Sequence, residues 1–312
     1  MARLFLGVDG GQSSTTALIG DETGRVVGFG RGGPCNHVRA SEGRAKFLNA
    51  IGGCVRSALD QAGVGEARFA SACLGFSGGP ADKEALVREL LSAGRLNVTN
   101  DAVVALAGAC AGEPGLIVIA GTGSISLGRN AAGETARAGG WGYVFGDEGG
   151  AFDIVRQALR AALRFEEGWG EPTALRALLL EATGAADANE LMHRFYMADW
   201  PRSRVATFAP LVDQAAADGD EAASDVIGRA AAELGLLGRA VRRRLFGDQE
   251  RVRVSYIGGV FRSGRLLTAF ARHFAGDRFD APEYGPAAGA LIEAYRAEGL
   301  RPVLENLPEF EK

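Results

Sequence analysis

The sequence is poor in the residues that would place it in several classes of protein. It has four cysteines, Cys35, Cys54, Cys73 and Cys110, without CxxC spacing, and three scattered histidines, a pattern that shows no zinc site. No apolar run approaches the roughly 18 residues of a membrane-spanning helix, and no charged segment with a long apolar core opens the chain. We therefore expect a cytoplasmic protein with reduced thiols and no membrane partner.

Positive charge is scarce as well. The 34 Lys and Arg residues are outnumbered by 38 Asp and Glu, which leaves a formal net charge of −4. A nucleic-acid backbone is bound chiefly by clustered Lys and Arg, and the basic run at residues 242–244 lies in a helical pattern between Leu237 and Leu245. Such a run is typical of a solvated helix face, so we expect no nucleic-acid partner.

What is present is the composition of a glycine-rich globular α/β protein. The chain has 46 glycines, and 47% of its residues are hydrophobic and 23% charged, which disfavours disorder. Its 312 residues suffice for two domains that each bury a core.

The order of the expected elements repeats once along the chain. Three strands, a helix, a strand, a helix and a strand come first, at residues 4–8, 15–19, 26–29, 45–62, 69–75, 81–91 and 96–99. The order then restarts, with strands at 116–120, 125–129 and 252–257 around a mostly helical middle, and helices at 266–274 and 286–295. This predicts two mixed sheets covered by helices. We expect an N-terminal lobe of residues 1–112, joined by the C-terminal helix 286–298, and a larger C-terminal lobe of residues 113–285.

The turn after the first strand has the residues of a phosphate site. It reads Asp9-Gly10-Gly11-Gln12-Ser13. Its glycines allow a close backbone approach, and successive N–H groups with a hydroxyl form a nest for phosphate oxygens. Asp9 suits a magnesium ion held through water, because that ion prefers oxygen ligands. Taken alone, the segment fits a plain hairpin turn equally well.

Two later turns repeat this design. One is formed by Gly121, Thr122, Gly123 and Ser124 after an apolar strand, and the other by Gly258 and Gly259 before a helix that runs through Ser263. A Gly-rich turn that opens a helix is a frequent place for a nucleotide. Each turn alone is a weak signal, and the three in this order favour ATP. The sequence has no GxxxxGK[ST], so ATP use cannot rest on that loop.

Asn100 and Asp101 end a strand and open an apolar helix at residues 102–109. Both residue types cap helices well, and from these residues alone capping is the stronger interpretation. A carboxylate at the C-terminal end of a strand can equally accept the proton of an attacking hydroxyl.

The segment at residues 139–150 combines glycines with Trp141, Tyr143, Asp147 and Glu148. Carboxylates bond the hydroxyls of a polyol and aromatic rings pack on its faces, so the segment suits a sugar. The two acids also suit the N-terminus of the following helix, and both interpretations can hold.

Two other motifs are disfavoured, the first by its context and the second, which does lie between a strand and a helix, by its lack of partner residues. Residues 28–33 have dinucleotide-binding spacing, but Pro34 and an irregular stretch follow where a helix is required. Residues 75–79 fit a nucleophile elbow around Ser77. A hydrolase would also need an Asp and then a His later in the chain, and His193 and His273 lie in plain helical patterns.

Together these motifs resemble the N-acetylglucosamine kinases of the BadF/BadG/BcrA/BcrD ATPase group in the actin–hexokinase superfamily. The resemblance spans residues 3 to about 295 and rests on the three turns, Cys35-Asn36-His37, Ser77-Gly78-Gly79, Thr99-Asn100-Asp101-Ala102, Gly140-Trp141-Gly142 and Gly146-Asp147-Glu148-Gly149. It implies two ribonuclease H-like lobes of the actin-like ATPase fold, with ATP and sugar in a central cleft.

The resemblance also implies roles for individual residues. Asp101 would be the catalytic base. ATP would be bound by the three turns, with contacts from Ser13, Thr122, Gly259 and Ser263. The sugar would be bound by Asn36, Ser124, Gly140, Trp141, Gly142 and Asp147.

We therefore expect phosphoryl transfer from MgATP to the C6 hydroxyl of N-acetylglucosamine or glucosamine, giving the sugar 6-phosphate and ADP, by a homodimer. Muramic-acid derivatives and glucose stay open as substrates. One alternative is an ATPase with an iron–sulfur cluster that activates an acyl-CoA reductase or dehydratase, but Cys35 and Cys110 lack the Gly-rich setting of such ligands. A sugar-sensing regulator is disfavoured because the first strand begins by residue 3.

Overall fold

The computed structural model describes residues 3–11, 14–35, 41–78 and 81–312. The chain divides into two compact units. Unit 1 comprises Met1–Pro114 and Ala281–Lys312, and unit 2 comprises Gly115–Asp280. In the described part of the chain, no helix combines the length and apolar character needed to span a membrane.

Unit 1 is built on a five-stranded mixed sheet in the order β3-β2-β1-β4-β5. The strands are β1 (Leu4–Gly10), β2 (Thr15–Asp21), β3 (Val26–Gly32), β4 (Arg68–Phe76) and β5 (Ser92–Asn100). The first three form antiparallel hairpins, whereas β1, β4 and β5 are parallel. Because parallel strands end at the same edge, the residues that follow β1, β4 and β5 are brought together there.

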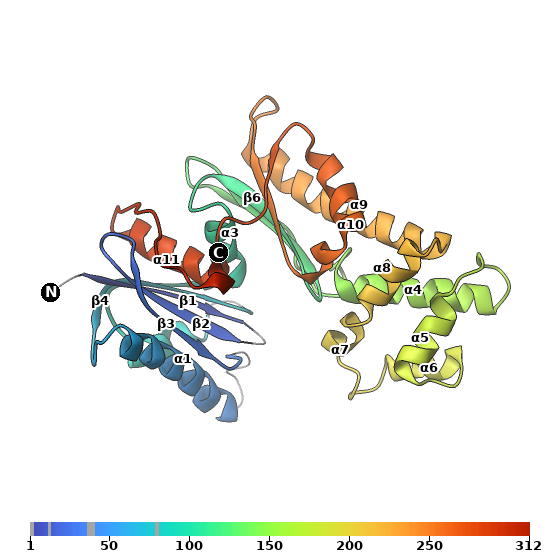
Figure 1. The fold of residues 1–312 in the computed structure, drawn as a ribbon, viewed down its shortest axis with the longest axis horizontal. Helices are drawn as coiled ribbons and strands as arrows, with labels where there is room; N and C mark the ends of the chain where they lie inside the picture. Colours follow the sequence, from blue (N-terminus) through green and yellow to red (C-terminus); the bar gives the residue numbers. More distant parts are fainter. Residues whose placement is uncertain (1–2, 12–13, 36–40, 79–80) are drawn as a thin grey trace. The chain divides into compact units, whose positions relative to one another are not determined.

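Helices cover both faces of this sheet (Figure 1). They are α1 (Ser41–Gln61), α2 (Glu84–Leu90), α3 (Asp101–Ala109) and α11 (Pro286–Ala297), followed by the short η3 (Glu309–Glu311). Alternate residues of β1 face opposite sides: Leu6 is buried in one cluster with Phe47 of α1, and Phe5 in another with Tyr295 of α11. The ring centres of Phe5 and Tyr295 lie 4.4 Å apart, so the C-terminal helix α11 completes the core of unit 1.

Unit 2 repeats the same sheet topology, in the order β10-β9-β6-β7-β8. Its strands are β6 (Gly115–Ala120), β7 (Ser124–Arg129), β8 (Thr135–Gly139), β9 (Arg253–Ile257) and β10 (Arg278–Phe279). The pairs β6–β7 and β7–β8 are antiparallel, and β9 is parallel to both β6 and β10. The ends of β6 and β9 therefore lie side by side, as those of β1 and β4 do in unit 1.

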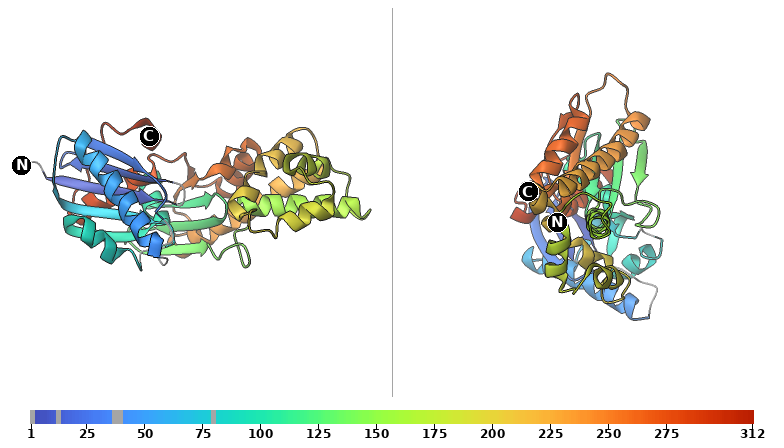
Figure 2. Two further views of the ribbon diagram at one scale, coloured as in Figure 1. Left: turned by 90° about the horizontal axis from the view of Figure 1, so that it is seen from below. Right: turned by 90° about the vertical axis from the view of Figure 1, so that its right-hand side faces the viewer.

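The long helix α9 (Glu221–Leu245) packs across this sheet, and most other helices of unit 2 pack on α9 or on one another. They are α4 (Ala151–Glu166), α5 (Leu175–Thr183), α6 (Ala188–Arg194), α7 (Arg202–Ala206) and α8 (Ala209–Ala217). Figures 1 and 2 show these five helices beyond one end of the second sheet. The connection after β9 holds η1 (Gly259–Arg262), α10 (Gly264–Ala271) and η2 (Arg272–Phe274).

The α/β class with two mixed sheets, as predicted from the sequence, is confirmed. Two strands of unit 2 were missed. Residues 135–139 of β8 have little apolar alternation and become a strand through pairing with β7, and β10 has only two residues. In the basic run, Arg243 and Arg244 are exposed as expected, whereas Arg242 is half-buried and forms an ion pair with Asp277 at 2.8 Å.

Candidate functional site

In unit 1, the parallel strand ends bring Asp9, Ser77 and Asp101 together. Asp9 lies opposite Gly75 of β4, and Phe76 lies opposite Asn100 of β5. The backbone N–H of Ser77 donates to the carbonyl of Gly10 at 3.1 Å, and its hydroxyl donates to Oδ2 of Asp101 at 2.6 Å. Ser77 therefore joins the ends of β1 and β5.

The two residues that open α3 have different roles. Asn100 is the N-cap, because its side-chain oxygen accepts a hydrogen bond from the backbone N–H of Val103 at 3.0 Å. Among the described residues, Asp101 accepts hydrogen bonds from the N–H of the adjacent Ala102 at 2.9 Å and from the hydroxyl of Ser77. Capping is thus done by Asn100, and the carboxylate of Asp101 is held at the strand ends.

A buried lysine lies beside this group. The ammonium of Lys83 donates to the carbonyl of Ser77 at 2.9 Å and lies 5.7 Å from the ring centre of Phe76. Burial lowers the pKa of Lys83, while the nearby charges of Asp82 and Asp101 oppose that shift. Lys83 could not be identified from the sequence, because a single Lys before a helix has no distinguishing pattern.

Two carboxyl groups of unit 1 have strongly raised pKa values. Burial, followed by the negative charges of Glu311 and Asp101, raises the pKa of Asp9 to about 7. Burial also raises the pKa of Glu311 to about 7, although Oε2 of Glu311 accepts the backbone N–H of Ala288 at 2.9 Å in the first turn of α11. Glu311 comes from the last residues of the chain, and nothing in its local sequence identifies it.

The turn after β1 is only partly described. The N–H of Gly11 donates to the carbonyl of Ser14 at 2.9 Å, and the N–H of Cys35 donates to the carbonyl of Gly11 at 3.4 Å. The predicted ATP residue Ser13 and the predicted sugar residue Asn36 lie outside the described residues. In the described part of the chain, no group of three or more His, Cys, Asp or Glu side chains could by itself hold a metal ion.

The four cysteines are all buried, and none of them forms a disulfide. Burial raises the pKa of Cys35, and it raises the pKa values of Cys54 and Cys73 to about 12. Metal and cluster ligation uses the thiolate form, so these surroundings disfavour cysteine as a ligand.

In unit 2, the second Gly-rich turn is fastened to the start of α4. The N–H groups of Ala151 and Phe152 donate to the carbonyls of Gly121 and Thr122 at 2.8 and 3.1 Å. A side chain at Gly123 would place its Cβ 2.4 Å from Cγ of Asp147. Close packing therefore requires glycine at this position.

The third turn lies directly beside the second. Ile257 pairs with Ile119 across β9 and β6, so Gly258 follows next to Ala120. Gly258 has φ of +116°, and a Cβ there would lie 2.2 Å from the carbonyl oxygen of Ala120. Both the backbone conformation and the space available require glycine here.

A pocket of about 380 Å³ opens between these turns and the helices of unit 2. Three residues that were predicted as ATP contacts from two different turns, Gly121, Gly259 and Ser263, line it together. A Cβ built on Gly121 or Gly259 would meet nothing within 4 Å. Packing and conformation do not demand glycine at these two positions, which therefore leave the backbone open to a ligand.

Several residues that line the pocket had no signal in the sequence. They come from α4, α7, α8, α9 and the start of α10, and include Ile154, Ala206, Pro210, Asp213, Ile227 and Leu266. The hydroxyl of Ser263 caps α10 by accepting the N–H of Leu266 at 3.1 Å, and it donates to Oδ1 of Asp213. The partner Asp213 is 50 residues away in the chain, so it could not be found from local sequence.

Part of the predicted sugar segment packs against the second turn. Asp147 is 8% exposed and has φ of +63°, in the left-handed region that is uncommon for a non-Gly residue. Its Oδ1 accepts the N–H of Ser124 at 3.4 Å, and its Oδ2 lies 3.6 Å from a guanidinium nitrogen of Arg202. The hydroxyl of Ser124 donates to the carbonyl of Glu148 at 2.6 Å. The structure therefore brings Ser124, Asp147 and Gly123 together.

The other part of this segment faces solvent. Gly140 donates its N–H to the carbonyl of Ser124 at 3.0 Å, which fixes the start of the loop. Beyond it, the Trp141 side chain is 68% exposed, with the guanidinium of Arg137 4.9 Å from its ring centre. Gly142 accepts the N–H of Phe145 at 3.2 Å in an exposed turn. Trp141 therefore has little structural role in this unit.

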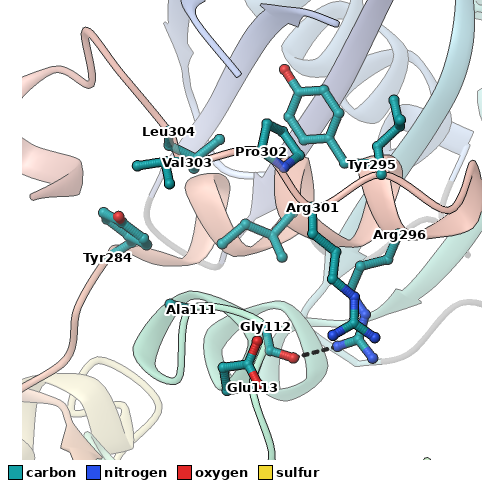
Figure 3. Close-up of a pocket in the computed structure, with 12 residues that line it drawn as sticks. Ala111, Gly112, Glu113, Tyr284, Tyr295, Arg296, Arg301, Pro302, Val303 and Leu304 are labelled. Atoms are coloured by element: carbon teal, nitrogen blue, oxygen red, sulfur yellow. Dashed lines mark hydrogen bonds between the residues drawn. The ribbon is translucent and has the colours of Figure 1, made fainter. Parts of the chain in front are cut away.

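A second pocket, of about 260 Å³, lies in unit 1 under the C-terminal segment (Figure 3). Arg296 lines this pocket and donates a hydrogen bond to the carbonyl of Gly112. Tyr284, Tyr295 and Leu304 also line it. None of the predicted site residues that the structure describes lines it.

Known proteins match this chain across both units. The model of the BadF/BadG/BcrA/BcrD ATPase family matches residues 6–294. An N-acetylmuramic acid/N-acetylglucosamine kinase of Clostridium acetobutylicum is 32% identical over 277 residues, which are 87% of this chain and 90% of the relative. An N-acetyl-D-glucosamine kinase of Dictyostelium discoideum is 30% identical over 273 residues, 82% of this chain and 85% of the relative.

Solved structures share the fold. A protein from Chromobacterium violaceum, assigned as an N-acetylglucosamine kinase, superposes with a TM-score of 0.74 at 29% identity, over 93% of this chain and 98% of that one. A ROK family glucokinase of Streptomyces griseus gives a TM-score of 0.56 at 19% identity, over 95% of this chain and all of that one.

Proposed function

The chain belongs to the BadF/BadG/BcrA/BcrD ATPase family, and we propose that it is an ATP-dependent kinase for amino sugars. The proposed reaction transfers the γ-phosphoryl group of MgATP to the C6 hydroxyl of N-acetylglucosamine or glucosamine and gives the sugar 6-phosphate and ADP. The names of the two curated relatives support the substrate class. The strongest structural support is the convergence of Gly121, Gly259 and Ser263 on one pocket of unit 2.

This pocket is the proposed site of the nucleotide. Its apolar wall, with Ile154, Ile227 and Leu266, suits a purine ring. The open backbone at Gly121 and Gly259 suits phosphate oxygens, which bind closely to N–H groups where no side chain intervenes. Thr122, Gly123 and Gly258 shape the two turns, and Gly10, Gly11 and Ser13 are proposed as further phosphate contacts.

Asp101 is the proposed general base. Its Oδ2 is held by the hydroxyl of Ser77, which fixes the carboxylate without neutralising its charge. A carboxylate held in this way can orient the sugar hydroxyl and accept its proton as the oxygen attacks phosphorus. Because Asn100 caps α3, Asp101 is not needed for that purpose.

Asp9 is the proposed residue for magnesium. Since the described residues offer no cluster of three ligands, they fit an ion that keeps most of its water and phosphate ligands, with Asp9 acting through water. When bound, Mg²⁺ offsets the negative charge that develops on the phosphates.

The sugar is assigned to the segment around Asp147. Asp147 accepts hydrogen bonds from sugar hydroxyls, Ser124, Gly140 and Gly142 line the site, and Trp141 packs on the sugar ring. Asn36 is proposed as a further contact. We also propose a cytoplasmic homodimer. Four cysteines without a disulfide support the reducing compartment, and light scattering in solution would measure the oligomeric state.

A coupled ADP-release assay over hexoses, amino sugars and N-acetylated amino sugars tests this function. We expect sugar-dependent ADP release with N-acetylglucosamine or glucosamine, and a phosphorus–proton coupling in the NMR spectrum of the product that assigns the phosphate to C6. Absence of sugar-dependent ADP release across the panel would rule out the proposed kinase. A phosphate at C1 would overturn only the assigned position.

A further inference from the structure

The pocket of unit 2 contains an acidic side chain that a phosphate site does not explain. Asp213 of α8 lines the pocket together with Gly121 and Gly259. A carboxylate repels the triphosphate of ATP, and like charges in a poorly solvated pocket interact strongly. Asp213 is therefore suited to a part of the nucleotide that is neutral and rich in hydroxyl groups.

The side chain of Asp213 is held in place by a chain of hydrogen bonds. The N–H of Leu266 donates to the hydroxyl of Ser263 at 3.1 Å, and that hydroxyl donates in turn to Oδ1 of Asp213. The start of α10 thereby fixes a carboxylate on α8. Such orientation before binding lowers the entropy lost when a ligand is held.

The carboxylate of Asp213 retains capacity to accept further hydrogen bonds. An ionised carboxylate has about four acceptor positions, and within the described ranges of the chain the hydroxyl of Ser263 is its one hydrogen-bond donor. The hydroxyl of Thr207, which also lines the pocket, donates its proton to the carbonyl of Arg204, and its neutral oxygen is a weaker acceptor than a carboxylate. Asp213 is therefore the strongest acceptor for the hydroxyl groups of a ligand on this side of the pocket.

We propose that Asp213 binds the ribose hydroxyls of ATP and makes the enzyme selective for ribonucleotides, with Ser263 as the residue that positions it. Two vicinal hydroxyls match a carboxylate that accepts hydrogen bonds on both oxygens, and acidic side chains bind ribose hydroxyls in other nucleotide folds. The apolar residues Ile227 and Leu266 remain for the base, and the open glycines for the phosphates. This inference rests on the proposed use of the pocket for ATP.

Direct binding of ATP, 2′-deoxyATP and 3′-deoxyATP to the full chain tests the assignment by calorimetry. We expect the wild-type protein to bind each deoxynucleotide about tenfold more weakly than ATP, the effect of losing one good hydrogen bond. In Asp213→Ala, ATP should bind about tenfold more weakly, with the three affinities within about twofold of one another. Asp213→Asn keeps one acceptor oxygen, so its ATP affinity should lie between those of the wild type and Asp213→Ala.

Asp218→Asn is the matched control, because Asp218 lies at the exposed C-terminal end of the same helix and does not line the pocket. It should retain the wild-type preference for ATP. Circular dichroism establishes that each variant is folded, and Asp213→Asn provides a second variant if Asp213→Ala does not fold.

The outcomes separate this inference from the proposed function. ATP binding with a ribose preference that Asp213→Ala removes supports the role of Asp213, even if no sugar is phosphorylated. A wild-type protein that phosphorylates amino sugars but binds ATP and both deoxynucleotides equally well overturns the role of Asp213 alone. A preference that persists in folded Asp213→Ala also overturns it, and absence of any ATP binding overturns both proposals.

Discussion

The hydroxyl of Ser77 donates a 2.6 Å hydrogen bond to Oδ2 of Asp101. Ser77 belongs to the segment that, in the sequence, also fits a nucleophile elbow. In the structure its proton is directed to a carboxylate, and in the described part of the chain no histidine bonds to its oxygen. The pair favours a base that is oriented by a hydroxyl over a serine nucleophile.

Asp101→Asn should lower kcat by at least ~100-fold, the usual lower scale of general-base catalysis. An amide oxygen can still accept the hydroxyl of Ser77 but cannot take a proton from the sugar, so KM for the sugar should change little. Steady-state kinetics measures both constants.

Asn100→Ala is the control for that variant. It should lower the free energy of unfolding by about 1 kcal/mol through loss of the N-cap and leave kcat nearly unchanged. Near-normal turnover of Asp101→Asn would remove Asp101 from the role of base.

The distinction between Asn100 and Asp101 shows what the sequence could and could not provide. Periodicity and turn residues were enough to predict the two mixed sheets, because the strands and turns are local patterns. Either Asn100 or Asp101 could accept the N–H of Val103, and the backbone conformation at one position decides that Asn100 does. The sequence left that choice open.

Residues that act through distant contacts could not be predicted. Glu311 bonds to Ala288 across 23 residues of chain and Asp213 bonds to Ser263 across 50, and neither Glu311 nor Asp213 has a local signal in the sequence. Glycines were the exception, since the turns at Gly121 and Gly258 were identified from sequence. Even there, only the structure separates Gly258, which the fold requires, from Gly259, which it does not.

Gly259→Ala should weaken ATP binding without unfolding the protein. A Cβ at this position meets no protein atom within 4 Å and projects from a residue that lines the pocket. We expect KM for ATP to rise about tenfold or more, equivalent to roughly 1.4 kcal/mol, with an unchanged melting temperature.

Two other alanine substitutions provide the controls. Gly276 is exposed, and a Cβ there would meet nothing within 4 Å, so Gly276→Ala should change neither KM for ATP nor the melting temperature. Gly258→Ala should lower the free energy of unfolding by about 2 kcal/mol or more, because it forces both a left-handed backbone and a contact with Ala120. An unchanged KM for ATP in Gly259→Ala would argue against this turn as a phosphate site.

Glu311 should make stability depend on pH. Burial raises its pKa from 4.5 to about 7 in the folded protein, so the folded state binds the proton more tightly than the unfolded state. The stabilisation from this group is complete below about pH 4.5 and is lost as the pH rises through about 7. Glu311→Gln mimics the protonated form and should gain roughly 3 kcal/mol relative to wild type between pH 4.5 and 8.

Urea unfolding of both proteins across this range measures the difference. Glu309→Gln is the control, because Glu309 has an 87% exposed side chain and lies in the same short turn. Its stability should follow that of the wild type at every pH. A constant difference between Glu311→Gln and wild type from pH 4.5 to 8 would contradict the raised pKa of Glu311.

Trp141 tests the sugar assignment without disturbing the fold. Its side chain is 68% exposed, so Trp141→Ala should leave the free energy of unfolding within about 0.5 kcal/mol of wild type. If the ring packs on the sugar, its loss should raise KM for the sugar about tenfold, with little change in KM for ATP. Phe145→Ala is the matched control, since Phe145 is 83% exposed in the same loop and has no assigned contact. Equal effects of the two substitutions on KM for the sugar would mean that the loop acts through general apolar contact, and Trp141 would lose its specific role.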